Sequence, residues 1–324
     1  MAKKEKKVLS ASRIKTYEDC SWKYWCNYHE KIPQTQNDGA CRGTVCHTVF
    51  EYLLLPKHKK CFDAIMEAGN TSGSPAVVRL LRMLLKKSCC FNEENLQMCI
   101  DMVYVGLNAD FFGEGGKADK PEIKFVIKNK DPEYEIMGFI DKKIKFKDKI
   151  KIVDYKSSKR KFSKKDLEAN MQAMTYTLAA KRKWPKSAKN VEVEFVFLKF
   201  PNQPLQQITI PEEQLKGFEH YLAFIYKQLN SFTKDQAKTN YAKDKMATKF
   251  FCKAGSHWKC PYLEPYDYYS LEDEEGNILK GAFTKEELEP AATNGNRVVK
   301  KRYEGCPAHP EGSGKEPEDP CDWI

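Results

Sequence analysis

The sequence has no uncharged apolar run that approaches the ~20 residues needed to cross a membrane. The apolar stretch at residues 49–55 contains Glu51 and stops at Pro56. The N-terminus, MAKKEKK, also lacks the apolar stretch of a secretory signal. We therefore expect a cytoplasmic protein that has no membrane partner.

The chain is not so small that it must depend on disulfides, because 324 residues can bury roughly three quarters of the unfolded surface. In a reducing compartment, most of its 12 cysteines should be buried thiols, with a few gathered around a metal. The hydrophobic fraction of 41% is ordinary for a globular protein. Lys and Arg number 55 against 45 acidic residues, a net charge of +10, which favours a polyanionic partner without identifying one.

The first third of the chain has a helical pattern. From Ser10 to Phe112, apolar residues recur at three- and four-residue steps. A loop rich in Gly and Lys follows, and then three β-type segments: 122–128, 135–146 and 150–156. Because the connections between them are short, we expect an antiparallel meander.

Helices and a further strand follow the meander. Ser163 and Asp166 form an acidic variant of a capping box, which predicts a long helix to about residue 183. A buried strand over 191–200 and an amphipathic helix over 211–232 come next. This order predicts an α/β core in which helices flank a mixed sheet. We expect three parts: a helical part at 1–115, a core at 116–232, and a Cys-containing and aromatic extension at 233–324.

Two acidic residues are predicted to meet on neighbouring strands. Asp154 and Lys156 are two apart, so their side chains share one face of a strand. Asp141 belongs to the preceding segment, and a short turn makes the two segments antiparallel neighbours. At ~4 Å and an effective dielectric near 20, the two carboxylates would repel by about 4 kcal/mol. A hard divalent cation would relieve that repulsion.

Several other residues could belong to the same site as this pair, although each also has a purely structural interpretation. His47 lies one helical turn from Gly43 and from Glu51, so a metal or a backbone segment could approach it. Gln172 and Tyr176 share a helix face, which fits a helix-to-sheet hydrogen bond or a role in the site. Glu51 is expected to orient His47 or to pair with a basic side chain. Glu122 is expected to be a solvated strand start, with assistance to a second ion as the alternative.

These motifs occur in one order: Gly43-x3-His47-x3-Glu51, Gly138-x2-Asp141, Asp154-Tyr155-Lys156 and Gln172-x3-Tyr176. In this the sequence resembles the RecB-like branch of the PD-(D/E)XK nucleases, over roughly residues 10–200. That branch includes the RecB and AddB nuclease domains, CRISPR-associated RecB-like exonucleases and many phage nucleases. The resemblance implies a restriction-endonuclease-like core.

The resemblance also implies an activity and a site. It implies a Mg²⁺- or Mn²⁺-dependent deoxyribonuclease, most often an exonuclease, that works in DNA recombination, repair or phage replication in the cytoplasm of a bacterial or phage-infected cell. A helicase or recombinase is an expected partner besides DNA with single strands or free ends. The implied metal ligands are His47, Asp141, Asp154 and the carbonyl of Tyr155. Lys156 is implied to be catalytic, and Gln172 and Tyr176 to support the site or to contact DNA.

A run of cations follows the Asp-x-Lys strand. Lys159, Arg160 and Lys161 lie in the loop before the Ser163 helix. Cationic side chains, hydroxyls and free helix amides all suit phosphate oxygens, so we expect this loop to bind DNA. The alternative is a solvated loop with no partner.

Some members of the resembled family hold an iron–sulfur cluster with one Cys before the core and three after it. This resemblance points to Cys20, Cys252, Cys260 and Cys321, with Cys306 as an alternate, as ligands of a [4Fe-4S] cluster. Structural zinc is a competitor, since His257-x2-Cys260 and Cys306-x2-His309 offer zinc-like pairs. The remaining cysteines are assigned to packing: Cys26, Cys41, Cys46, Cys61, Cys89, Cys90 and Cys99. The aromatic residues of the tail are also expected to pack.

Two other functions remain open at this point. One is a catalytically idle DNA-binding or scaffold protein of the same fold. Retention of His47, Asp141, Asp154 and Lys156 argues against it. The other is a zinc-stapled interaction module in which the acidic pair is incidental.

Overall fold

The computed structural model describes residues 8–35, 37–239, 252, 259–293 and 295–308. The chain divides into two compact units. Unit one contains residues 1–11 and 36–227, and unit two contains residues 12–35 and 228–324. Each unit thus combines an early and a later segment, whereas the sequence predicted three consecutive parts.

Unit one is built on a five-stranded mixed sheet in the order β1-β4-β5-β6-β7. The central strands β5 and β6 are parallel, and the other pairs are antiparallel. This confirms the predicted α/β class with helices around a mixed sheet. The strands are β1 (Lys117–Ala118), β4 (Lys142–Lys145), β5 (Lys149–Lys156), β6 (Asn190–Phe197) and β7 (Leu205–Ile208).

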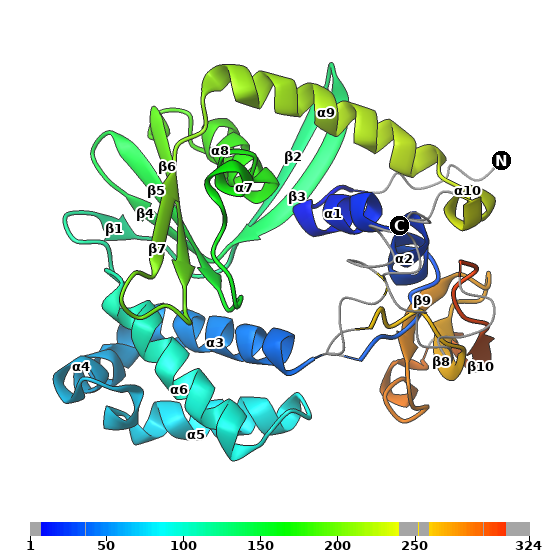
Figure 1. Ribbon diagram of the computed structural model, residues 1–324, viewed down its shortest axis with the longest axis horizontal. Helices are drawn as coiled ribbons and strands as arrows, with labels where there is room; N and C mark the ends of the chain where they lie inside the picture. Colours follow the sequence, from blue (N-terminus) through cyan, green and yellow to red (C-terminus); the bar gives the residue numbers. More distant parts are fainter. Residues whose placement is uncertain (1–7, 36, 240–251, 253–258, 294, 309–324) are drawn as a thin grey trace, which may run out of the picture. The chain divides into compact units, whose positions relative to one another are not determined.

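Helices α3 to α6 cover one face of this sheet (Figure 1). Their apolar stripes meet the sheet in one core, in which Val49 and Leu53 of α3 join Val153 of β5 and Val196 of β6. Such burial explains why β5 and β6 are nearly continuous in apolar residues. The helices are α3 (Asp38–Leu54), α4 (Lys59–Ala68), α5 (Pro75–Lys87) and α6 (Glu93–Asn108).

Helix α8 (Met171–Lys183) lies between the sheet and a separate hairpin of β2 (Ile123–Lys130) and β3 (Glu133–Ile140), as Figure 1 shows. The hydroxyl of Tyr176 on α8 reaches Asp154 of β5. Its ring meets that of Phe125 in β2 at 6.3 Å between centroids. Helix α9 (Glu212–Ser231) follows β7.

Two predicted elements are interrupted in the structure. The segment 135–146 was predicted as one strand, but the chain bends at Asp141, and β3 and β4 belong to different sheets. The helix predicted from Ser163 to 183 is two helices, α7 (Lys164–Glu168) and α8. Asn170 separates them because its side chain caps α8, accepting from the Ala173 amide at 2.9 Å. The capping box of Ser163 and Asp166 is confirmed.

Unit two contains a three-stranded antiparallel sheet that the sequence did not predict. Its strands are β8 (Tyr266–Glu272), β9 (Ile278–Ala282) and β10 (Arg297–Tyr303), and its helices are α1 (Ala11–Asp19), α2 (Ser21–Tyr28) and α10 (Lys234–Thr239). The aromatic side chains pack as expected: the Tyr303 ring lies 5.9 Å from that of Tyr262 and 5.4 Å from that of Tyr266. Phe250, Phe251 and Trp258 lie outside the described residues.

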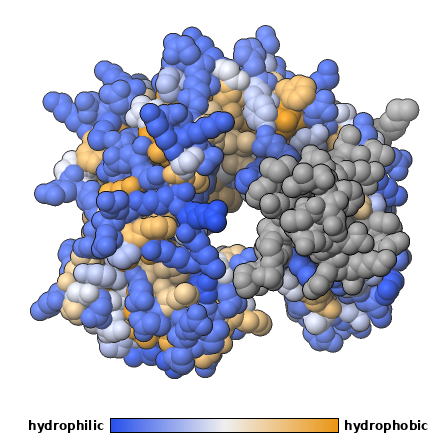
Figure 2. Space-filling model, viewed as in Figure 1, coloured by the Kyte–Doolittle hydropathy of each residue, from blue (hydrophilic) through white to orange (hydrophobic). Residues whose placement is uncertain are grey.

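The surface of the molecule is rich in polar residues. Figure 2 shows hydrophilic residues over most of the coloured face, with small scattered apolar patches. Among the helices of the described ranges, none has the length and apolarity to cross a membrane.

A glycine contact between α6 and α3 generates a stability prediction. A Cβ added at Gly106 would lie 2.6 Å from Phe50 Cε1 and 3.0 Å from Leu198. We expect Gly106→Ala to lower the free energy of unfolding by about 1–3 kcal/mol, because overpacking outweighs the gain in helix propensity. Gly217 in α9 has nothing within 4 Å of its added Cβ, so Gly217→Ala should raise that free energy by about 0.5–1 kcal/mol. Urea unfolding measures both, and equal effects would contradict the packing argument.

Candidate active site

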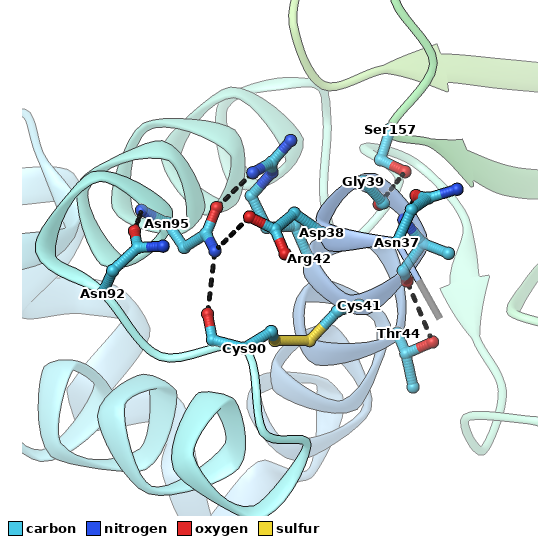
Figure 3. The surroundings of a disulfide bond; sticks show 11 residues. Asn37, Asp38, Gly39, Cys41, Arg42, Thr44, Cys90, Asn92, Asn95 and Ser157 are labelled. Atoms are coloured by element: carbon cyan, nitrogen blue, oxygen red, sulfur yellow. Dashed lines mark hydrogen bonds between the residues drawn. A yellow bond between two sulfur atoms is a disulfide. The ribbon is translucent and has the colours of Figure 1, made fainter. Parts of the chain in front are cut away.

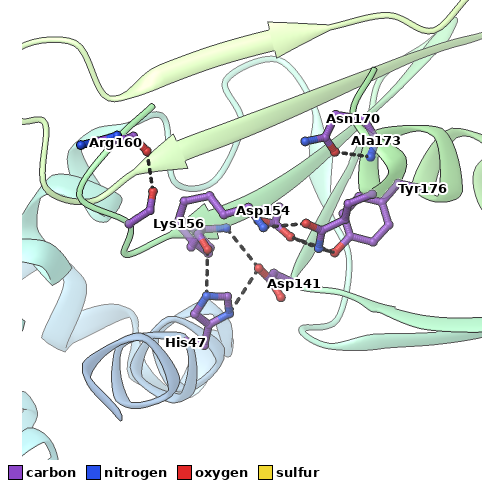
Figure 4. Close-up of polar contacts among 11 residues, drawn as sticks. His47, Asp141, Asp154, Lys156, Arg160, Asn170, Ala173 and Tyr176 are labelled. Atoms are coloured by element: carbon purple, nitrogen blue, oxygen red, sulfur yellow. Dashed lines mark hydrogen bonds and ion pairs between the residues drawn. The ribbon is translucent and has the colours of Figure 1, made fainter. Parts of the chain in front are cut away.

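Asp154 is a buried carboxylate near the end of β5, and only 2% of it is exposed. Gln172 Nε2 and the Tyr176 hydroxyl both donate to its Oδ1, at 2.7 and 2.8 Å. The ammonium of Lys156 lies 2.7 Å from Oδ2 and also donates to Gln172 Oε1 at 2.6 Å. Figure 4 shows Asp154 and Lys156 of β5 and Tyr176 of α8 converging. The structure therefore brings together four of the predicted site residues.

Burial is the main influence on the charge of Asp154. It raises the pKa of this carboxyl, and the charge of Asp141 raises it further, whereas Lys156 lowers it. Burial also raises the pKa of Tyr176, which therefore stays protonated as a donor. The buried carboxylate is stabilised by two neutral donors and one cation.

Asp141 and His47 meet beside the backbone of Tyr155 in β5. Asp141, at the bend between β3 and β4, accepts from the Tyr155 amide at 3.1 Å through Oδ2. The same oxygen lies 3.3 Å from His47 Nδ1, while His47 Nε2 lies 2.9 Å from the Tyr155 carbonyl oxygen. Figure 4 shows His47 projecting from α3 toward Asp141. All four predicted metal donors thus belong to this neighbourhood.

His47 is protonated at neutral pH in this arrangement. Burial lowers the pKa of the imidazole, but the hydrogen bond and charge of Asp141 outweigh burial and raise that pKa to about 9. Both ring nitrogens then donate, to Asp141 and to the Tyr155 carbonyl. The charges of His47 and Lys156 together balance those of Asp141 and Asp154.

Gly43 allows α3 to approach the end of β5. A Cβ on Gly43 would lie 2.7 Å from the Ser157 hydroxyl, so that hydroxyl would have to move to admit a larger residue. Phe50, one turn past His47, stacks on the Tyr155 ring at 4.1 Å between centroids. These two contacts set the distance at which His47 faces the Tyr155 carbonyl.

The donor set fits a hard divalent cation. It comprises two carboxylates, a backbone carbonyl and an imidazole, which are ligands that Mg²⁺ and Mn²⁺ accept. Oδ1 of Asp154 accepts two hydrogen bonds, whereas its Oδ2 faces the Lys156 ammonium at 2.7 Å. Across the part of the chain that the structure describes, however, no three Asp, Glu, His or Cys side chains are grouped to hold a metal ion. The carboxylates face Lys156 and His47 instead.

The prediction that Glu51 orients His47 stays a prediction. No described basic side chain pairs with Glu51; burial first, and then the charges of Glu122 and Asp141, raise its pKa, whereas the charge of His47 lowers it. Glu122 has a left-handed backbone with φ 51°, and its amide donates to the Asp141 carbonyl at 3.2 Å. Glu51, His47 and Asp141 also line a cavity of about 10 Å³. This volume is about that of one water.

Lys142 is a buried cation that the sequence analysis missed. Its ammonium donates to the Phe111 carbonyl at 2.8 Å and lies 5.3 Å from the centre of the Tyr155 ring. Burial lowers the pKa of Lys142 to about 7. It follows Asp141 directly and anchors the start of β4 beneath the site. Its position in a Lys-rich segment gave no signal of burial.

The predicted DNA-binding loop lies beside the site. Lys159 and Arg160 are exposed, while Lys161 lies 5.7 Å from the centre of the Phe200 ring. The loop begins at Ser157, which contacts α3. Contact with nucleic acid at these residues stays a prediction.

The cysteines are divided between the two units. Cys20, Cys252, Cys260 and Cys306 belong to unit two. Burial first, and then the neighbouring thiols of Cys260, Cys20 and Cys306, raise the pKa of Cys252 to about 12. Cys321, His257 and His309 lie outside the described residues, so the complete ligand sets stay predictions.

Two cysteines assigned to packing are instead bonded. Cys41 of α3 and Cys90 form a disulfide, with their Cα atoms 6.7 Å apart (Figure 3). The assignment of Cys89 to packing is also wrong, because this thiol is exposed. A separation of 49 positions gave no local signal of the bond.

The family model of the PD-(D/E)XK nuclease superfamily matches residues 8–263. The chain therefore belongs to this superfamily, whose members are typically metal-dependent nucleases. A solved structure titled "Crystal structure of SSO0001" is similar at 13% identity and a TM-score of 0.27, covering 75% of this chain and 94% of that chain. No curated protein matches the sequence.

The His47 pair makes stability depend on pH. The raised pKa means that this pair stabilises the metal-free protein fully below the unfolded pKa near 6.5 and loses its effect as pH rises through about 9. With EDTA present, we expect the stability difference between the wild type and His47→Gln to shrink by about 1–3 kcal/mol from pH 6 to pH 9.5. His58→Gln is the control, because the pKa of His58 is lowered. A difference that is constant with pH would contradict the ion pair.

Proposed function

We propose that this protein is a DNA exonuclease of the RecB-like branch, dependent on Mg²⁺ or Mn²⁺. The observation that carries the proposal is the convergence of Asp141, Asp154, Lys156 and His47 around the end of β5. Two carboxylates beside an ammonium, with an imidazole and a carbonyl close by, are the groups that cation-assisted phosphodiester hydrolysis requires. Few other reactions call for this set in a buried strand end.

The residues divide the work of the reaction. Asp141, Asp154, His47 and the Tyr155 carbonyl would hold the cation, which would activate water and offset charge on the phosphate. Lys156, released from Asp154, would orient the attacking water and stabilise charge on the phosphate oxygens. Gln172 and Tyr176 would keep the carboxylate of Asp154 in place through their hydrogen bonds to Oδ1.

The substrate we propose is DNA with single strands or free ends, cut with little base specificity. The cations Lys159, Arg160 and Lys161 would contact its phosphates, which carry no sequence information. Recombination, repair or phage replication in the cytoplasm are the settings that this activity fits, with a helicase or recombinase as a partner.

Substitutions at the strand end test the proposal. We expect Asp154→Asn and Lys156→Gln to lower the rate of cleavage of end-labelled DNA by about 100-fold or more while both variants still bind DNA in EDTA. Lys147→Gln and Asp148→Asn, in the exposed turn at the other end of β5, should cut at the wild-type rate. Magnesium, manganese and EDTA are compared on linear and circular substrates.

Each outcome of that assay distinguishes the functions. Wild-type cutting without an added or bound divalent cation, or full activity of both variants, would remove these residues from the mechanism. DNA binding without cutting by the wild type under every metal would favour an idle scaffold. Cutting of circular DNA as fast as of linear DNA would overturn the exonuclease.

For the cysteines we propose a [4Fe-4S] cluster held by Cys20, Cys252, Cys260 and Cys321, or by Cys306 in place of one of them. The electrostatic influence of Cys20, Cys260 and Cys306 on Cys252 supports a common location. Structural zinc is the competing occupant, because a thiolate site with a nearby His suits it equally.

Metal analysis decides between these occupants. We expect protein purified without oxygen to be brown, with labile sulfide and about four iron atoms per chain. Cys260→Ser should abolish the colour, while Cys61→Ser, a change in unit one, should retain it. One zinc per chain in a colourless protein would replace iron by zinc. An absence of both metals would leave these cysteines as packing thiols.

A further inference from the structure

Three cations belong to separate elements that meet beside the site. They are Arg42 of α3, Lys159 of the loop after β5, and Lys199 of the turn after β6, and are called here the Arg42 cluster. The Leu198 amide donates to the Lys156 carbonyl at 2.9 Å. Lys199 therefore follows directly after a residue that is hydrogen-bonded to the last residue of β5. The Ser157 hydroxyl lies 3.5 Å from the Gly39 carbonyl of α3. The three elements therefore meet at the active-site end of β5.

Arg42 is the buried member of the cluster, because only 8% of it is exposed. Nη1 donates to Asn95 Oδ1, and Asn95 Nδ2 donates in turn to Asp38 Oδ2 at 2.9 Å and to the Cys90 carbonyl at 2.8 Å (Figure 3). This network fixes the guanidinium. Within the described residues, its buried Nε has no partner. A buried donor without an acceptor is unfavourable, and an anion bound beside the guanidinium would offset its charge.

The three cations of the Arg42 cluster form no ion pair with a carboxylate in the described part of the chain. Among residues with a described placement, no carboxylate lies within 4 Å of the cations of Arg42, Lys159 or Lys199. Burial, and then the charges of Arg42 and Lys159, lower the pKa of Lys199. Like charges held together in this way repel each other unless an anion joins them.

Three other buried or partly buried lysines of unit one have a described oxygen partner for their ammonium groups, unlike Lys159 and Lys199. Lys142 donates to the Phe111 carbonyl. Lys143 pairs with Asp119 at 2.9 Å, and Lys151 pairs with Glu194 at 3.4 Å. The fold therefore provides partners for its other buried ammonium groups and leaves this cluster open.

The loop that carries Lys159 is held in place. Its Phe162 forms two hydrogen bonds with the side chain of Gln206 in β7: the amide donates to Oε1 at 3.1 Å, and the carbonyl accepts from Nε2 at 3.0 Å. Lys161 rests against the Phe200 ring. A loop ordered before binding loses less entropy when it takes up a ligand.

We propose that Arg42, Lys159 and Lys199 form a phosphate-binding site that holds a second phosphate group of the nucleic acid strand, next to the one that is cut. The proposal rests on the proposed nuclease function and names a subsite of it. A guanidinium with an unused donor and two ammonium groups match the charge and the acceptor oxygens of phosphate. The phosphate is either a terminal monoester or an internal diester.

Binding of a fluorescent single-stranded oligonucleotide in EDTA tests the site without cleavage. We expect Lys199→Gln to lower the slope of log K against log salt by about 0.7, the value for one phosphate contact on a single strand. Lys147→Gln, which removes one exposed charge at the far end of β5, should leave the slope unchanged. Equal slopes in Lys199→Gln and the wild type would overturn the proposal, as would an equal loss in Lys147→Gln.

Oligonucleotides with different terminal groups show whether the bound phosphate is a terminal monoester or an internal diester. The same oligonucleotide is used with a 5′-phosphate, with a 3′-phosphate and with hydroxyl ends. A loss in Lys199→Gln for only one phosphorylated form assigns the site to that terminal monoester, and an equal loss for every form assigns it to the backbone. Arg42→Lys, which keeps the charge but not the geometry, should weaken binding also. Its melting temperature shows whether it folds, and Lys199→Gln carries the test if it does not.

Inorganic phosphate provides a second readout. It should raise the melting temperature of the wild type and of Lys147→Gln more than that of Lys199→Gln. If the wild type cuts DNA while Lys199→Gln binds DNA and phosphate like the wild type, this inference alone fails. If the wild type cuts nothing while Lys199→Gln still loses phosphate binding, the nuclease function fails and the phosphate site stands.

Discussion

The site depends on the neutralisation of a buried carboxylate. Asp154 is removed from water at the end of a central parallel strand, a position that disfavours its charge. Lys156, Gln172 and Tyr176 offset this cost, and α8 contributes two of those three groups. The contacts of α8 with the sheet therefore belong to the chemistry as much as to the core. Any change that moves α8 leaves the carboxylate short of partners.

A second set of charged contacts, made by His47, links α3 to β5. His47 bonds the Tyr155 carbonyl and Asp141 at once, and so joins a helix, a strand and the bend between β3 and β4. In the metal-free protein its charge, with that of Lys156, stands where a divalent cation would otherwise compensate the carboxylates. If His47 ligates the proposed cation, binding would displace its proton, since a ligand nitrogen has to be deprotonated.

The cations beside the site bear on how the protein would bind nucleic acid. Lys142 and Lys143 have a carbonyl and a carboxylate partner, whereas no described carboxylate lies within 4 Å of the cations of the Arg42 cluster. The proposed phosphate site would thus lie beside the proposed cation site, at the same end of β5. The network from Arg42 through Asn95 to Cys90 also holds the disulfide region against α3.

The sequence by itself determined the local features of this protein. Alternation along β5 placed Asp154 and Lys156 on one face, the capping box began α7, and apolar spacing predicted the helices of the first third and the long α9. These follow from repeats within one element, which any reader of the chain can count. Only tertiary structure brought His47 to Tyr155, 108 positions away, buried Lys142, split the strand at Asp141 and the helix at Asn170, and collected Arg42 with Lys199. Such outcomes depend on how separate elements pack, and no periodicity records which distant side chains will share one volume.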